Sequence, residues 1–261
     1  MLRGEFNRDK LSYNNREQRA QKGQANAYNR FADRIETLND NLVETVPERF
    51  KMSFDFSENP AFNSSYALTL DVAHLTKSFT NPLFRDLSFS LRKGDRLIIQ
   101  GPNGCGKTTL LRIIMNLIQA DEGKVNISTS NIGYLDQEQE GMPQDKTAVE
   151  LLNEDPLINV SEENAIQNLS HFGIYTYHDL KSPLKFLSVG CRRKAQLCQI
   201  VMRKCPILLL DEPTNHIDFP SLEAIEETLL SFPGIIIAAT HDRYFTEKVA
   251  TQILNLENCK C

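Results

Sequence analysis

Long apolar segments are missing from this sequence of 261 residues. The longest apolar runs are Ile207–Leu210 and Ile235–Ala239, which are long enough only for buried strands. A membrane-spanning helix needs about 18 or more consecutive apolar residues, so the sequence predicts no direct insertion into a membrane. The N-terminal segment from Arg3 to Lys10 is polar and charged, and it lacks the apolar centre of a secretory signal. These absences predict a cytoplasmic location.

Paired cysteine motifs are missing as well. The six cysteines are Cys105, Cys191, Cys198, Cys205, Cys259 and Cys261. Three of them recur every seven residues, which is a helical spacing rather than the Cys-x-x-Cys spacing of a zinc site. A disulfide framework is not expected in a chain of this length without an export signal. We therefore expect free, buried thiols.

The chain as a whole has no excess of positive charge, because 29 Lys and Arg stand against 34 Asp and Glu. The net charge of −5 gives no general argument for nucleic-acid binding. Locally the balance differs: residues 3–34 carry eight basic and four acidic side chains, and eight minus four leaves an excess of +4. This asymmetry is typical either of a segment that binds a polyanion or of a solvated helix face.

Composition divides the chain into two parts. Residues 1–65 are polar and poor in apolar side chains, so they cannot build a core of their own. Within them, Arg16–Asn39 has no proline and many helix-forming residues, which predicts an exposed helix in a charged linker arm. Residues 66–261 have the composition of a globular domain.

Strand and helix patterns alternate in this second part. Strands are predicted at Ala67–Val72, Leu87–Leu91, Arg96–Gln100, Ile207–Leu210 and Ile235–Ala239. Helices are predicted at Thr108–Ile118 and at Pro220–Leu230, where Glu223, Glu226 and Glu227 are expected to face solvent. The order strand, helix, strand predicts an α/β fold with a mainly parallel sheet and right-handed crossovers.

A glycine-rich motif follows the third predicted strand. It reads Gly101-Pro102-Asn103-Gly104-Cys105-Gly106-Lys107-Thr108 and matches the phosphate loop of P-loop nucleotide-binding proteins in full. Its glycines let backbone N–H groups point at phosphate oxygens, and the following helix adds positive potential at its N-terminus. Lys107 would bridge the β- and γ-phosphates, Thr108 would ligate Mg²⁺, and Thr109 would begin the helix beside the α-phosphate. The motif predicts ATP and Mg²⁺ as ligands.

Two carboxylates end the buried strand Ile207–Leu210. Asp211 and Glu212 are expected at the carboxyl edge of the sheet, where ligands of open α/β sheets bind. Asp211 has the position of a residue that holds Mg²⁺ through its water shell. Glu212 is placed to act as general base on an attacking water.

Two longer segments carry a family resemblance. They are Asp211-Glu212-Pro213-Thr214-Asn215-His216-Ile217-Asp218 and Thr240-His241-Asp242-Arg243-Tyr244-Phe245. Over about residues 66–257 the sequence resembles the ABC-F subfamily of ABC ATPases, which are tandem, membrane-free ABC proteins that act on the ribosome. The resemblance implies a P-loop fold of ABC type, in which an antiparallel β subdomain and a helical subdomain accompany the parallel core sheet.

The resemblance also assigns further site residues. Phe79 would stack on adenine, although a core phenylalanine is the alternative at this position. Gln137 would sense Mg²⁺ and the attacking water, and His241 would contact the γ-phosphate. Ser188 and Gly190 lie in a signature motif that departs from the family at Val189 and Cys191, and they would bind the γ-phosphate of ATP held by an opposing domain. Asp218 resembles the D-loop aspartate of the family. The departures from the family place the hydrolysis rate and the packing of that domain in question.

The resemblance implies partners and leaves alternatives open. ABC chemistry requires a second ABC domain, either in tandem or in a homodimer. The arm resembles the second half of the ABC-F interdomain linker, and this resemblance implies contact with the ribosome and tRNA. The ABC-F family includes proteins of the antibiotic-resistance, ribosomal protection type. An ATP-binding subunit of an ABC membrane transporter is the alternative function, and a nucleotide-gated binding fragment without hydrolysis is a third.

Overall fold

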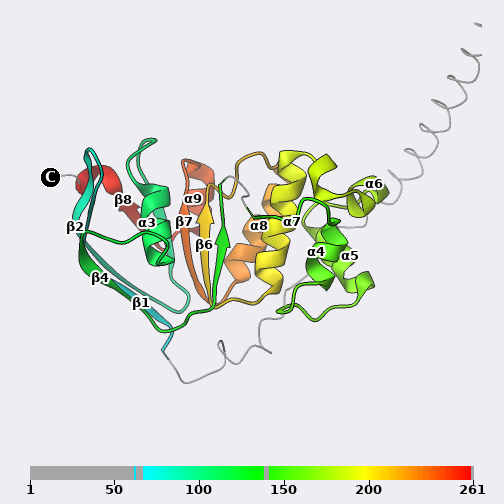
Figure 1. The fold of residues 1–261 in the computed structure, drawn as a ribbon, viewed down its shortest axis with the longest axis horizontal. Coiled ribbons are helices and arrows are strands. Elements are labelled where there is room, and N and C mark those ends of the chain that lie inside the picture. The colour runs from blue at the N-terminus through cyan, green and yellow to red at the C-terminus, as the bar shows by residue number, and fades with distance from the viewer. Residues whose placement is uncertain (1–61, 63–66, 138–140, 260–261) are drawn as a thin grey trace, which may run out of the picture. The chain divides into compact units, whose positions relative to one another are not determined.

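The computed structural model describes residues 62, 67–137 and 141–259 (Figure 1). The predicted helix Arg16–Asn39, and all of the arm except Phe62, lie outside the described residues. Phe62 packs edge-to-face on Phe232, with 5.6 Å between the ring centroids. The division of the chain at residues 65 and 66 remains a prediction.

A five-stranded parallel sheet forms the centre of the domain. Its strands are β3 (Arg96–Gln100), β5 (Ile132–Leu135), β6 (Ile207–Asp211), β7 (Ile235–Ala239) and β8 (Gln252–Asn255). They lie in the order β5-β6-β7-β3-β8, and every neighbouring pair is parallel. The central strands β6 and β7 are buried along their whole length, as is usual for strands covered on both faces. The predicted parallel sheet is confirmed.

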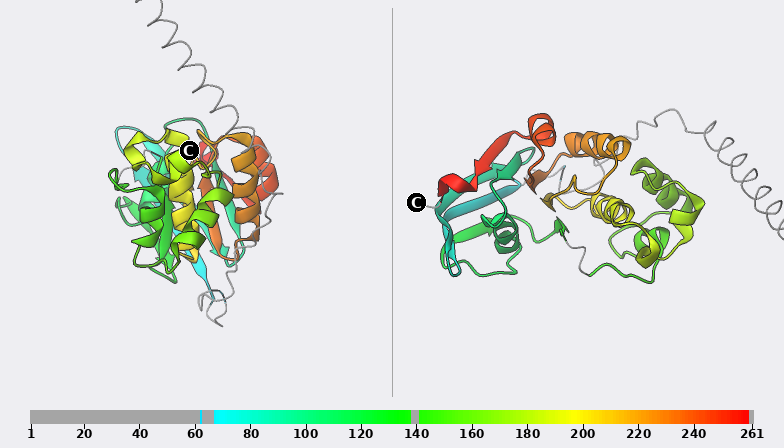
Figure 2. Two further views of the ribbon diagram at one scale, coloured as in Figure 1. Left: turned by 90° about the vertical axis from the view of Figure 1, so that its right-hand side faces the viewer. Right: turned by 90° about the horizontal axis from the view of Figure 1, so that it is seen from above.

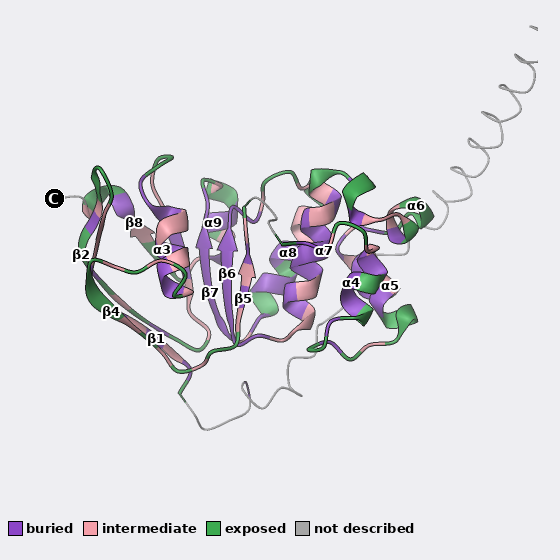
Figure 3. Ribbon diagram, viewed as in Figure 1, coloured by how far each residue is buried: buried purple, intermediate pink, exposed green. Residues whose placement is uncertain are grey.

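Side chains alternate between the two faces of this sheet and enter two hydrophobic cores. Ile98, Leu208 and Ile236 pack with helices α7 (Val189–Met202), α8 (Phe219–Ser231) and α9 (Arg243–Val249). Leu209 and Ile237 face the other way, toward helix α3 (Lys107–Ile114) and the antiparallel sheet. Figure 3 shows the central strands β6 and β7 and the inner faces of these helices as buried, whereas the edge strands β5 and β8 are less buried.

The antiparallel sheet and a group of short helices complete the domain. The sheet has the order β2-β1-β4, with β1 at Thr69–Ser78, β2 at Pro82–Arg92 and β4 at Glu122–Ile127. The short helices are α4 (Ala148–Asn153), α5 (Glu162–His171), α6 (Tyr177–Lys181), η1 (Leu184–Phe186) and η2 (Leu256–Cys259). Figures 1 and 2 show the antiparallel sheet and the helices α4 to α6 at opposite ends of the described domain. The ABC-type fold expected from the resemblance is confirmed.

Several predicted elements differ in length from the observed ones. The strand predicted at Leu87–Leu91 extends from Pro82 to Arg92. The strand predicted at Ala67–Val72 begins at Thr69 and continues to Ser78, because irregularities after Val72 interrupt its alternation without ending its pairing. The helix predicted at Thr108–Ile118 begins at Lys107 and ends at Ile114. Asn116 has a φ of 58°, a left-handed conformation that stops the helix although apolar residues continue beyond it.

One prediction about α8 is wrong. Glu226 does not face solvent: it is fully buried, and its Oε2 accepts a hydrogen bond from Nζ of Lys248 at 2.6 Å. Helix α9 packs on this side of α8 and supplies that lysine, so a polar position on the isolated helix becomes an internal ion pair. Glu227 is exposed as predicted.

The cysteines and the absence of long apolar segments are also part of the sequence predictions. Cys105, Cys191, Cys198 and Cys205 are free and buried, as predicted, and Cys259 is half-buried. In the described ranges, no helix combines the length and apolar character that crossing a membrane requires.

Candidate nucleotide-binding site

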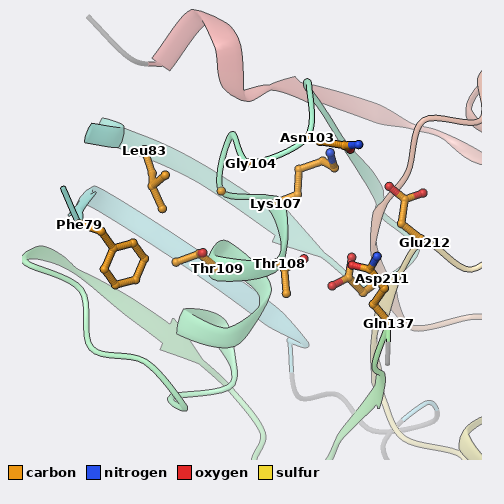
Figure 4. A pocket seen from close by; sticks show the side chains of 11 residues that line it. Phe79, Leu83, Asn103, Gly104, Lys107, Thr108, Thr109, Gln137, Asp211 and Glu212 are labelled. Atoms are coloured by element: carbon orange, nitrogen blue, oxygen red, sulfur yellow. The ribbon is translucent and has the colours of Figure 1, made fainter. Parts of the chain in front are cut away.

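The order of the parallel strands brings the predicted site together. Parallel strands end at the same edge of a sheet, and β5, β6, β7 and β3 are consecutive neighbours. Gln137 follows β5, Asp211 ends β6 and Glu212 comes directly after it. His241 follows β7, and the phosphate loop follows β3. Residues far apart in the sequence therefore meet along one edge (Figure 4).

A pocket of about 420 Å³ lies at this edge. Ten of the predicted residues line it: Phe79, Asn103, Gly104, Gly106, Lys107, Thr108, Thr109, Gln137, Asp211 and Glu212. Leu83, on β2, also lines the pocket and was not predicted. Figure 4 shows Phe79 and Leu83 at one end, Asp211 and Glu212 at the other, and the phosphate loop between them. The pocket thus has an apolar end and an acidic, polar end.

The phosphate loop requires its glycines. Gly101, Gly104 and Gly106 have φ angles of 145°, 77° and 107°, which side chains rarely allow. A Cβ on Gly106 would also lie 3.1 Å from Cβ of Leu83. Cys105 is buried beneath the loop, and its N–H donates to O of Pro102 at 3.2 Å. The loop delivers the chain directly into the first turn of α3, an arrangement that suits binding of an anion.

Lys107 and His241 meet at the polar end of the pocket. The ammonium of Lys107 donates to O of Gly101 at 2.9 Å and to O of Pro102 at 3.3 Å, and it lies 3.0 Å from Nε2 of His241. The same Nε2 is 2.8 Å from Oδ1 of Asn103 and 3.4 Å from Oε1 of Glu212. Depending on its tautomer, the imidazole accepts from the lysine or donates to one of the two oxygens. His241 therefore connects the phosphate loop to the acidic strand end.

Asp211 has the environment of a cation ligand. Burial raises the pKa of its carboxyl, a hydrogen bond with Thr108 lowers it, and the nearby Glu212 and Asp136 raise it further, so that the net shift is upward. Its Oδ2 is buried and has no hydrogen-bond partner among the described residues. A cation beside this oxygen would compensate the desolvated charge. Mg²⁺ characteristically takes one or two carboxylates together with phosphate oxygens and water, so this donor set fits it.

Glu212 has a constrained backbone. Its φ of 49° lies in the left-handed region, which costs a residue with a Cβ roughly 1 kcal/mol. Three hydrogen bonds hold it there: its N–H donates to O of Ala239 at 2.8 Å, and its carbonyl accepts from Nη2 of Arg193 at 2.6 Å and from N–H of Asn215 at 3.2 Å. Strain of this kind persists where the surroundings enforce it, frequently at functional sites.

Phe79 is not a core residue. Its side chain is 62% exposed, and it forms the far wall of the pocket from the two acids. Nζ of Lys77 lies 5.1 Å from the centre of its ring. The exposed face and the position in the pocket remove the alternative of a core phenylalanine and leave a ring available for stacking.

Ser188, Gly190 and Asp218 lie outside the pocket, at the beginnings of helices α7 and α8. Ser188 caps α7, and its hydroxyl oxygen accepts from N–H of Cys191 at 3.1 Å. Gly190 packs on the chain after β6, where a Cβ would lie 2.1 Å from O of His216. Asp218 caps α8 and accepts a hydrogen bond from Nζ of Lys194 at 2.9 Å. These three residues belong to a second surface, away from the phosphate loop.

Cys191, where the signature motif departs from the family, has an unreactive thiol. Burial raises the pKa of its thiol to about 11, with the nearby Asp179 adding to the shift. The thiol therefore stays protonated at neutral pH, although it lies in the first turn of a helix. Val189, the other departure, is 46% exposed and adds an apolar side chain to the same surface.

A strand, a glycine loop and a helix, with an acidic strand end two strands away in the same parallel sheet, define a nucleotide-binding domain of the P-loop class. The family model described as "ABC transporter" matches residues 84–215, just over half of the chain. The chain belongs to this family, as an ATP-binding domain of the ABC type.

Three similar proteins illustrate the match. The ribosome protection protein VmlR of Bacillus subtilis is 40% identical over 191 residues, which are 72% of this chain and 34% of that protein. ABC transporter F family member 5 of Arabidopsis thaliana is 32% identical over 221 residues, 83% of this chain and 31% of that protein. The chain thus spans about a third of these relatives. A solved structure of a putative ABC transporter ATP-binding protein from Pyrococcus furiosus, 23% identical, covers 74% of this chain and all of its own, with a TM-score of 0.63.

Proposed function

We propose that the chain binds and hydrolyses Mg-ATP as one ATP-binding domain of an ABC-F-type protein that acts on the ribosome. The observation that carries the ATPase part is the pocket itself. Two separate segments, the start of α3 and the end of β6, supply the residues Lys107, Thr108, Asp211 and Glu212, which line one cavity with an exposed aromatic ring at its other end. This is the set that phosphoryl transfer needs: a phosphate cradle, metal ligands and a base.

Each residue has a defined part in this proposal. The ring of Phe79 stacks on adenine, and the loop amides with Lys107 bind the phosphates. Lys107 exchanges its present carbonyl acceptors for phosphate oxygens, which are stronger acceptors. Thr108, Asp211 and Gln137 hold Mg²⁺, which when bound neutralises charge on the phosphate oxygens.

The reacting atoms lie at the acidic end of the pocket. Glu212 accepts a proton from water as the water oxygen bonds to the γ-phosphorus, and the bond from the γ-phosphorus to the bridging oxygen breaks to give ADP and phosphate. His241 is 3.4 Å from the Glu212 carboxylate and 3.0 Å from the Lys107 ammonium, so it orients the γ-phosphate between them.

A second ABC domain completes the site in this proposal. The hydroxyl of Ser188 accepts from the Cys191 N–H, which leaves its own proton for a phosphate oxygen of ATP held by that domain. Gly190 and Asp218 border the same surface, where Val189 and Phe219 are exposed. The second domain comes from a longer tandem chain or from a second copy.

The ribosomal part of the proposal rests on the relatives and on the arm. The Bacillus subtilis relative is named a ribosome protection protein, and the Arabidopsis thaliana relative is named an F family member. The excess of positive charge in residues 3–34 suits ribosomal RNA or tRNA as a partner. A role on the ribosome places the protein in the cytoplasm and extends to antibiotic resistance if the ribosome is protected from a drug.

ATP turnover and ribosome co-sedimentation test this function with a Glu212→Gln variant. We expect the variant to bind Mg-ATP normally, to lose turnover by at least about 100-fold, and to accumulate on ribosomes when ATP is present. Glu227→Gln is the matched control, because it makes the same chemical change at an exposed position of α8. Wild-type turnover in Glu212→Gln would refute the assignment of the base. Co-purification with membranes instead of ribosomes would favour the transporter subunit, and binding without any turnover would favour a nucleotide-gated module.

A further inference from the structure

Arg193 is a charged side chain that is buried in the interior of the domain. It lies on α7, only 1% exposed, and it is the largest of the fully buried side chains in the described part of the chain. An isolated buried charge is costly, so its surroundings must compensate it. No feature of the phosphate-loop or strand-end motifs points to this residue.

The guanidinium joins the ends of two neighbouring strands. Its Nη1 donates to the carbonyls of Asp136 and Gln137, both at 3.3 Å, just after β5. Its Nη2 donates to the carbonyls of Asp211 and Glu212 at the end of β6, the latter at 2.6 Å. The rigid planar fork of arginine therefore spans two chain segments that each supply residues to the pocket.

Three carboxylates offset part of the cost of burying the guanidinium. Burial lowers the pKa of Arg193, and the neighbouring carboxylates of Asp211, Glu212 and Asp136 raise it by less, so that the net shift is downward. An arginine stays protonated despite such a shift, because its guanidinium cannot be deprotonated in proteins. The guanidinium thus lies beneath three acidic side chains and offsets part of their mutual repulsion.

The contact with Glu212 has a direct consequence for the site. Both backbone groups of Glu212 are held: Ala239 accepts from its N–H, and Arg193 and the N–H of Asn215 donate to its carbonyl, Arg193 at the shorter distance of 2.6 Å. The residue keeps a left-handed φ of 49°. The direction of its side chain toward the pocket follows from that backbone conformation. Without the guanidinium, the carbonyl loses the shorter of its two hydrogen bonds and keeps only the one from Asn215, so less holds the residue in its left-handed conformation.

We propose that Arg193 is a positioning residue for the Mg²⁺ and water sites: it fixes the carbonyls of Gln137, Asp211 and Glu212 so that their side chains converge. This inference rests on the proposed function, because it assigns the metal and the base to those side chains. Supporting residues of this kind typically change metal affinity or activity by about 10- to 100-fold when they are removed.

The test uses the full chain and compares Arg193→Met, Arg193→Lys and the control Arg203→Met. Methionine keeps the length of the side chain without its donors, and lysine keeps the charge without the fork. Arg203 lies at the end of the same helix, where its Nε donates to the buried Asp155 carboxylate at 2.7 Å, so Arg203→Met reports on loss of a structural arginine.

Two readouts separate positioning from folding. The first is the affinity for ATP, measured once with Mg²⁺ and once with EDTA. The ratio of these two affinities measures how much the metal contributes to ATP binding. The second is kcat per folded molecule and the Mg²⁺ concentration at half-maximal turnover. For Arg193→Met we expect affinity in EDTA within about 3-fold of wild type, a Mg²⁺ contribution reduced about 10-fold, and kcat reduced about 100-fold. Arg193→Lys should fall between, and Arg203→Met should move only the thermal midpoint.

A folded Arg193→Met with the wild-type Mg²⁺ contribution and wild-type kcat would overturn the inference. If Arg193→Met does not fold, Arg193→Lys decides, because a normal Mg²⁺ dependence in that variant would equally remove the need for the fork. A wild-type chain that binds Mg-ATP without turnover would refute the proposed hydrolysis alone. The Mg²⁺ contribution to binding would still decide the role of Arg193.

Discussion

Removal of the Phe79 ring should weaken ATP binding without disturbing the fold. The side chain is 62% exposed and lines the pocket, so Phe79→Ala takes little from the hydrophobic core and should change the free energy of unfolding by less than about 0.5 kcal/mol. Stacking of a base on an aromatic side chain contributes about 1–3 kcal/mol per base. The Kd for ATP should therefore rise between about 5-fold and about 150-fold.

The assay compares two ligands that share the triphosphate, of which only one carries the adenine that Phe79 is proposed to contact. ATP and inorganic tripolyphosphate are titrated, each with Mg²⁺, into wild type and Phe79→Ala by calorimetry. The proposal predicts weaker binding of ATP and unchanged binding of tripolyphosphate, because the phosphate loop is intact. Phe186→Ala is the control: Phe186 is 68% exposed, and Nζ of Lys185 lies 5.3 Å from its ring, but it lies outside the pocket.

Two results would refute this reasoning. An unchanged ATP affinity in Phe79→Ala would show that adenine does not stack on this ring. An equal loss for ATP and tripolyphosphate would show that the substitution acts through the phosphate loop rather than through the base.

Two further predictions concern stability and are checked by urea denaturation. Gly190→Ala places a Cβ 2.1 Å from O of His216, so the start of α7 must move. The free energy of unfolding should therefore fall by about 1–3 kcal/mol. A loss under about 0.5 kcal/mol would show that the helix shifts at little cost. Burial raises the pKa of Asp155, but hydrogen bonds from Leu157, Arg203 and Gln199 bring it below its ordinary value of 3.8. Its charge therefore stabilises the fold above that value and stops doing so as the pH falls through the lowered pKa, so the stability gap between wild type and Asp155→Asn should shrink in acid. A gap that stays constant from pH 7 to 3 would contradict this.

The sequence predicted those elements best whose signals are contiguous. The strands β3 and β7 occupy the predicted residues, since both are short apolar runs in the middle of a parallel sheet. The helix α3 ends earlier than predicted, because the apolar pattern continues to Ile118 whereas the chain turns at Asn116. Glu226 was misplaced for a related reason: a helical pattern cannot show that another helix covers its polar face.

The same distinction separates the predicted site residues from those that were missed. The phosphate loop and the acidic strand end are contiguous motifs, and parallel strands must bring them to one edge. Leu83 and Arg193 reach the site only through tertiary packing, Leu83 from a neighbouring sheet and Arg193 from a helix beneath the strands. No local spacing of residue types marks either of them. The predicted arm remains a prediction, because it lies almost entirely outside the described residues.

Direct titration of Mg-ATP into the full chain tests the central claim, with Lys107→Ala beside it and Lys185→Ala as control for loss of an exposed lysine. We expect saturable binding by wild type and by Lys185→Ala with a Kd below about 1 mM, the upper range of substrate constants. Lys107→Ala should bind at least about 10-fold more weakly, because a charged hydrogen bond to phosphate contributes about 1.5–3 kcal/mol. Absence of binding by wild type, or equal affinity in Lys107→Ala, would contradict the account.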